Sequence, residues 1–137
     1  MKGETNLSIL IKNMHPILNK GQYVFCTILD VNSIDFKQII HVFKEKEGYT
    51  LVIEKEYAHK KGYEYTSTFA WITLLVHSSL DAVGLTAAFA TALAENKISC
   101  NVVAGFYHDH IFVPYDLGQQ AVNVLQKLSM ECHKTIK

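Results

Sequence analysis

The second half of the chain has an order of apolar segments that leaves few possible folds. The segment FAWITLLV, residues 69–76, is apolar nearly throughout, as expected of a strand at the centre of a sheet. Sequence patterns predict an alanine-rich helix over about 81–96, strands over 98–106 and 110–114, and a last amphipathic helix capped by Asp116. This order of strand, helix, strand, strand and helix predicts an α+β fold, with helices on one side of a mainly antiparallel sheet.

The first half of the chain is less regular. Apolar residues at helical spacing predict a short first helix that stops at Pro16, and the segment YVFCTIL, residues 23–29, predicts a strand. A second strand is predicted for residues 49–54. Between these strands a helix is predicted over 35–46, because apolar residues recur there at i, i+3, i+4 and i+7, namely Phe36, Ile39, Ile40 and Phe43.

The most polar stretch of the chain, KEYAHKKGYEYTS at residues 55–67, separates the two halves. Lysines and glutamates are mixed along it, and Gly62 would break a helix, so a solvated turn or linker is expected. We therefore predict an irregular N-terminal half over residues 1–67 and a C-terminal half over residues 68–137.

The alanine-rich helix is expected to bury two faces. On a helical wheel Leu85, Phe89 and Leu93 form one ridge of large side chains, which should rest on the sheet. A second stripe is smooth, and small side chains allow another helix to approach closely. This stripe predicts a tight helix–helix contact, within the chain or across a dimer, and consists of Val83, Ala87, Ala90 and Ala94.

The front of the same helix suggests a binding site. Asp81 can cap the helix, and the N–H groups of a first turn are unsatisfied and positively polarised. Gly84 should lie in that turn, where a glycine permits close approach of a backbone or of a ligand carboxylate. Packing of the protein's own chain against the glycine, with no ligand, is the equally open alternative.

Composition excludes several other classes of function. Thirteen basic and thirteen acidic side chains cancel, which argues against a nucleic-acid partner. No apolar run approaches the roughly 20 residues that a membrane span needs, and the polar start of the chain does not resemble a signal peptide. The three cysteines form no CxxC pair, so reduced thiols in a cytoplasmic protein are expected.

Two sequence patterns that could indicate catalysis or metal binding are better explained by structural roles of the same residues. The His108-Asp109-His110 turn, with His77 as a possible third nitrogen, offers too few converging ligands for zinc. His110 is expected to pack or hydrogen-bond beside the sheet, and Asp109 to stabilise the turn. Ser78 cannot readily be activated by His77, because neighbours on a strand point to opposite faces. We therefore predict no catalytic residue, no metal site and no cofactor.

Three segments carry a resemblance to a known family. EGYTLVIEKEYA (47–58), HSSLDAVGLTAAFATALAENKIS (77–99) and NVVAGFYHDHIFVP (101–114) resemble small bacterial proteins built as tandem ACT-like halves. They are related to the ACT domain, the small-molecule regulatory fold of aspartokinases. The resemblance implies a ferredoxin-like βαββαβ repeat, side-by-side sheets and effector binding at the junction of two ACT units.

The resemblance also implies a set of ligand-binding residues. In ACT regulators the loop from the first strand into the first helix contacts an amino acid, helped by the following strand. Main-chain N–H groups would hold the carboxylate, and Asp81 or Asn101 the ammonium group. The implied residues are Ser78, Ser79, Leu80, Asp81, Ala82, Val83, Gly84, Asn101 and Val102.

One departure from the repeat predicts that the halves are interlocked. Too few residues follow the last helix to form the closing strand of the second repeat. We expect a strand from residues 1–67 to take its place, most readily 23–29. The leading hypothesis is a non-catalytic, amino-acid-binding regulatory module that forms homo-oligomers and acts on a separate enzyme. The alternative is an oligomerisation or interaction domain with no ligand.

Overall fold

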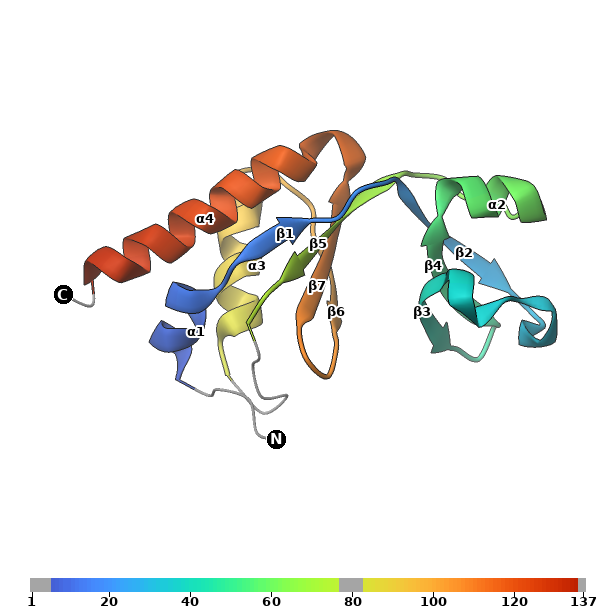
Figure 1. Ribbon diagram of the computed structural model, residues 1–137, viewed down its shortest axis with the longest axis horizontal. Helices are drawn as coiled ribbons and strands as arrows, with labels where there is room; N and C mark the ends of the chain where they lie inside the picture. The colour runs from blue at the N-terminus through green and yellow to red at the C-terminus, as the bar shows by residue number, and fades with distance from the viewer. Residues whose placement is uncertain (1–5, 77–82, 136–137) are drawn as a thin grey trace. The chain divides into compact units, whose positions relative to one another are not determined.

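The chain forms two compact units, one of which is built from both ends of the sequence. The computed structural model describes residues 6–76 and 83–135 (Figure 1). The discontinuous unit combines residues 1–20 with residues 70–137, and the inserted unit consists of residues 21–69. The boundary between the two ACT-like halves, predicted from the sequence to follow residue 67, stays a prediction.

The discontinuous unit has a sheet with helices packed against it. Its strands, in hydrogen-bonded order, are β1 (Pro16–Leu18), β5 (Phe69–Leu74), β7 (Asp109–Pro114) and β6 (Asn101–Ala104). Its helices are α1 (Leu7–Asn13), α3 (Leu85–Glu95) and α4 (Gly118–Thr135), the last preceded by a 3-10 turn at Tyr115–Leu117. The pairs β1–β5 and β6–β7 are antiparallel, as predicted.

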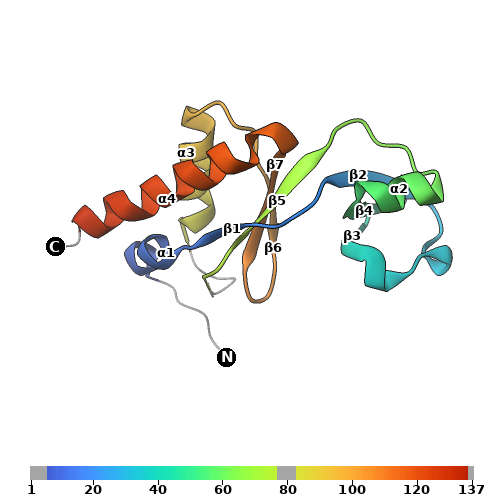
Figure 2. The same ribbon diagram turned by 45° about the horizontal axis from the view of Figure 1, so that its top comes forward.

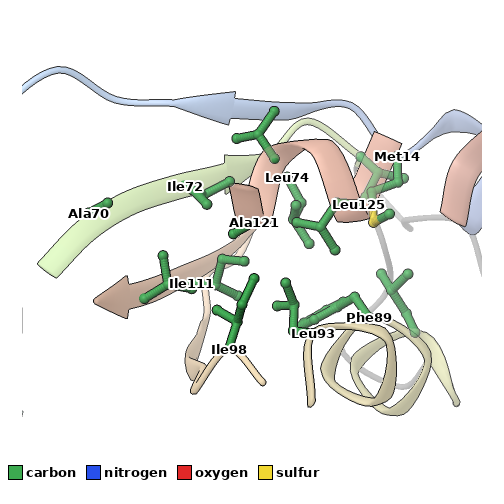
Figure 3. Close-up of a cluster of buried hydrophobic side chains, with 14 of the residues drawn as sticks. Met14, Ala70, Ile72, Leu74, Phe89, Leu93, Ile98, Ile111, Ala121 and Leu125 are labelled. Atoms are coloured by element: carbon green, nitrogen blue, oxygen red, sulfur yellow. The ribbon is translucent and has the colours of Figure 1, made fainter. Parts of the chain in front are cut away.

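One hydrophobic core joins these elements (Figure 3). Leu85, Phe89 and Leu93 are buried along one side of α3, which confirms the predicted ridge. They share the core with Leu10 of α1 and Leu125 of α4. From the sheet, alternate residues of the central strands face this core, namely Ala70, Ile72 and Leu74 of β5 with Ile111 and Val113 of β7.

The closing strand of this unit is β1, so the halves are interlocked as predicted but through a different segment. Pro16, Ile17 and Leu18 pair with Leu74, Thr73 and Ile72. The prediction that residues 23–29 fill this place is wrong. That segment forms β2 (Tyr23–Ile28), which pairs along its whole length with β4 (Tyr49–Glu54) instead. β1 has only three residues and begins with a proline, which an edge strand tolerates at its first position.

The inserted unit is a smaller sheet covered by one short helix. Its strand order is β3 (Ile39–Lys44), β4 and β2, with β2 also meeting β5 through the single pair Tyr23–Phe69. Figure 2 shows helix α2 (Lys55–Lys61) over these strands. The core of the unit contains Val24, Cys26, Ile34, Leu51, Ile53 and Ala58.

The predicted helix over residues 35–46 is wrong. Two short 3-10 turns, Val31–Ser33 and Phe36–Gln38, lead directly into strand β3. The pairing of β3 with β4 shifts by one residue between Ile39 and His41, so Ile40 is an extra residue in the ladder. Such a bulge interrupts the alternation of a strand, and here it made the apolar spacing match that of a helix.

The polar stretch at residues 55–67 is not a linker throughout. Residues 55–61 form α2, which buries Ala58. Gly62 ends this helix in the left-handed conformation, with φ of +71°, a place where glycine carries little strain. The expectation of a turn or linker is therefore wrong for residues 55–61, because Gly62 ends a helix there rather than preventing one.

The interlocked core can be tested with two substitutions on α1. Leu10→Ala should lower the free energy of unfolding of the discontinuous unit by about 2–5 kcal/mol, because Leu10 is fully buried in its core. Ile9→Ala is the matched control, because Ile9 is 42% exposed, and it should cost about 0.5 kcal/mol or less. Urea unfolding measures both, and equal effects would show that α1 does not belong to this core.

Candidate functional site

The predicted binding loop is described only at its end. Ser78, Ser79, Leu80, Asp81 and Ala82 lie outside the described residues. Val83 is 82% exposed, and α3 begins only at Leu85, later than predicted. Gly84 is the N-cap of the helix, with φ of +99°, and no side chain among residues 6–76 and 83–135 caps the first turn. Within these ranges the N–H groups of the first turn therefore lack a capping side chain.

The structure also gives Gly84 a packing role. A Cβ atom at this position would lie 3.0 Å from Cδ2 of Leu7, a distance that forces a neighbour to move. The positive φ adds strain for any other residue. At Gly84, close approach is therefore made by the Leu7 side chain of helix α1, not by a strand.

Asn101 and Val102 lie on the edge strand β6. Asn101 pairs with Phe112 and its Nδ2 donates to the Phe112 carbonyl at 3.4 Å, while Phe112 stacks on Trp71 near the start of β5. The loop into α3, by contrast, follows the end of β5. Along a strand this offset is on the order of 10 Å. Within one chain the structure therefore does not bring Asn101 beside the start of α3.

Asp109 is a candidate that sequence reasoning did not assign to the site. It is the first residue of β7, it is only 7% exposed, and by alternation it faces the helices with Ile111. Because Thr73 contacts His110, Asp109 lies beside the end of β5, where the chain leaves toward α3. Burial raises the pKa of Asp109.

His108, on the same turn, carries an unsatisfied polar atom. Its Nδ1 is buried and has no hydrogen-bond partner within the described part of the chain. The turn itself is held by the Gly105 N–H, which donates to the His108 carbonyl at 2.9 Å. A buried polar atom without a partner costs stability, so Asp109 and His108 are both groups that a ligand could satisfy.

His110 has a structural role, as the sequence predicted. Trp71 Nε1 donates to His110 Nδ1 at 3.1 Å, and an indole N–H can only donate. Nδ1 is therefore the acceptor, and a neutral ring carries its proton on Nε2. Thr73 Oγ1 lies 3.1 Å from the same nitrogen and accepts from Asn19 Nδ2 at 2.9 Å. This network connects β1, β5 and β7.

Among residues 6–76 and 83–135, no group of three or more His, Cys, Asp or Glu side chains could hold a metal ion. No helix in these ranges is long and apolar enough to cross a bilayer. The arrangement that remains can bind: uncapped N–H groups suit a carboxylate, and a buried carboxyl suits a cation.

Comparison with known proteins identifies the fold family. Residues 2–70 match one ACT-domain family, and residues 66–127 match another. No curated protein matches the chain significantly. Among solved structures, a Vibrio cholerae protein of unknown function, described as a possible transport protein, is 50% identical. The match covers 90% of this chain and 95% of that one, with a TM-score of 0.81.

More distant structures share the fold. The regulatory subunit of aspartate kinase from Thermus flavus is 10% identical, with 83% and 96% of the two chains covered and a TM-score of 0.61. Clostridium acetobutylicum aspartate kinase, an allosteric enzyme, is 14% identical, with 82% and 34% covered and a TM-score of 0.59. ACT domains are regulatory modules that typically bind small molecules such as amino acids and often oligomerise. The chain belongs to the ACT-domain family and carries two such domains in tandem.

Proposed function

We propose that the chain is a non-catalytic regulatory module that binds an amino acid or a similar small metabolite. Membership in the ACT family supports regulation by a small molecule. The observation that carries the proposal is the start of α3, where the N-cap is a glycine and no described residue caps the first-turn N–H groups with its side chain.

The first turn of α3 provides the carboxylate site. The N–H groups of Leu85, Thr86 and Ala87 precede the first intrahelical bond, in which Ala88 N–H donates to the Gly84 carbonyl. Thr86 and Ala87 are exposed, so a ligand can reach this end of the helix. The helix dipole adds favourable electrostatics for an anion there. Residues 78–84 remain the proposed contact segment around it.

Asp109 provides the countercharge for the ammonium group. Its carboxyl lies near the end of β5, on the side of the sheet that faces the helices, and it is costly to ionise without a partner. An ammonium group beside it would remove that cost and could donate to the buried His108 Nδ1 as well. A zwitterion is therefore the ligand that satisfies both ends of the site. We place the protein in the cytoplasm and the enzyme it regulates on a separate chain.

A second candidate function is self-association without a ligand. The small-residue stripe on α3 was predicted to be buried, yet Val83, Ala87 and Ala94 are exposed in the single chain, and only Ala90 packs against the core. This exposed stripe favours a contact between two copies of the chain.

Amino-acid binding should be visible as thermal stabilisation. A ligand at 100 times its Kd contributes about 2.7 kcal/mol, which raises Tm by several degrees, so at least one of the twenty amino acids should give such a shift. Thr86→Asp should lower the affinity for that amino acid by at least about fivefold, because the new carboxylate occupies the same anion site. Thr91→Asp is the matched control further along α3, where it should change affinity little. Equal effects of Thr86→Asp and Thr91→Asp on affinity would show that the start of α3 is not part of the binding site.

The role of Asp109 predicts a specific pH dependence. Its raised folded-state pKa means that stability is lost as pH rises from the unfolded pKa through the folded one. Asp109→Asn removes this loss, so the variant should gain stability over the wild type between pH 3 and pH 7 in urea unfolding. The same variant should lose amino-acid affinity. Asp116→Asn removes an exposed carboxylate, and it should change neither stability nor amino-acid affinity. A variant that still binds as tightly as the wild type would contradict the assignment.

The self-association candidate has its own test. Ala87→Lys and Ala94→Lys place charges on the exposed stripe, so they should dissociate an oligomer without lowering Tm by more than a few degrees. Light scattering after size-exclusion chromatography measures the mass of each variant. A wild-type chain that is monomeric at all concentrations would exclude this candidate.

A further inference from the structure

The inserted unit has an open groove that the proposed amino-acid site does not use. The groove has a volume of about 810 Å³ and lies between β2 and the segment that follows α2, residues 63–66. This volume is within the range of ordinary small-molecule sites, about 300–1,000 Å³. Three aromatic side chains contribute to its lining, namely Phe25, Tyr63 and Tyr65.

The polar lining of the groove has one sign of charge. Glu64 is its only ionisable carboxylate, and no lysine, arginine or histidine is among the described residues that line it. Threonine hydroxyls add acceptors, among them those of Thr27 and Thr66. Aromatic faces are also negative in their electrostatics. The groove is therefore complementary to a cation and unfavourable for an anion.

The aromatic walls are held in place. Tyr65 Oη hydrogen-bonds to His59 Nε2, and the two rings stack with centroids 5.6 Å apart. Tyr63 packs against the core of the inserted unit. Phe25 meets Phe69 edge to face, at 5.1 Å between centroids. Fixed walls lose little conformational entropy on binding, which favours a specific ligand over a transient contact.

We propose that this groove is a second binding site, for a small organic cation that bears a primary ammonium or guanidinium group on a short aliphatic body. Glu64 pairs with the charge, the tyrosine faces cover the aliphatic part, and the threonine hydroxyls accept hydrogen bonds. The site lies wholly in the inserted unit, so it is independent of the amino-acid site at α3.

Calorimetric and NMR titrations with butylamine test this proposal, with 1-butanol as a neutral probe of the same size. Butylamine should bind at pH 7.5 and shift the amide signals of residues 63–66, whereas 1-butanol should not. Glu64→Gln should weaken binding about threefold to fivefold, the range of an exposed ion pair, and added salt should weaken it further. Tyr65→Leu should weaken it as well.

Two controls separate this site from other effects. Glu56→Gln removes the same charge from an exposed position on α2 outside this groove, and it should leave butylamine affinity unchanged. Thr86→Asp should also leave it unchanged, which keeps this site distinct from the amino-acid site. Equal binding of butylamine and 1-butanol, or equal effects of Glu64→Gln and Glu56→Gln, would overturn the proposal.

Discussion

The antiparallel pairing of β1 with β5 is the contact on which the rest of the discontinuous unit depends. It brings residues 16–18 beside residues 72–74 and gives the sheet the closing strand that the second repeat lacks. Asn19 strengthens the junction, because its N–H donates to the Trp71 carbonyl at 2.8 Å. Since the inserted unit occupies residues 21–69, both of its connections leave from these two neighbouring strands. The inserted unit therefore interrupts the sequence of the discontinuous unit.

The same pairing makes β5 an inner strand, with β1 on one side and β7 on the other. The end of β5 is therefore held by a neighbouring strand on each side. Asp109, buried at the start of β7, lies beside this end, from which the chain continues toward α3. Asp109 and the start of α3 therefore belong to the same compact unit. In the proposed site, charge at both ends would favour a zwitterion.

Much of the fold could be predicted from sequence patterns, and the failures have physical causes. Long apolar or amphipathic segments, such as β5 and the buried ridge of α3, were predicted because burial decides their period. The bulge at Ile40 gave the apolar residues of β3 the spacing of a helix. Strand β1 is too short for its apolar residues to show a periodic pattern. In the site, the role of Leu7 against Gly84 depends on a contact between residues far apart in the chain. Asp109 was missed for the same reason, since its burial depends on the helices that cover it.

The proposed function depends on an amino acid binding at the start of α3 through main-chain amides. An NMR titration of ¹⁵N-labelled protein with the amino acid that stabilises it tests this most directly, because it observes each amide separately. We expect saturable shifts concentrated at residues 83–87, with a change at Asp109. Saturable shifts confined to other parts of the chain, or none with any amino acid, would contradict the claim.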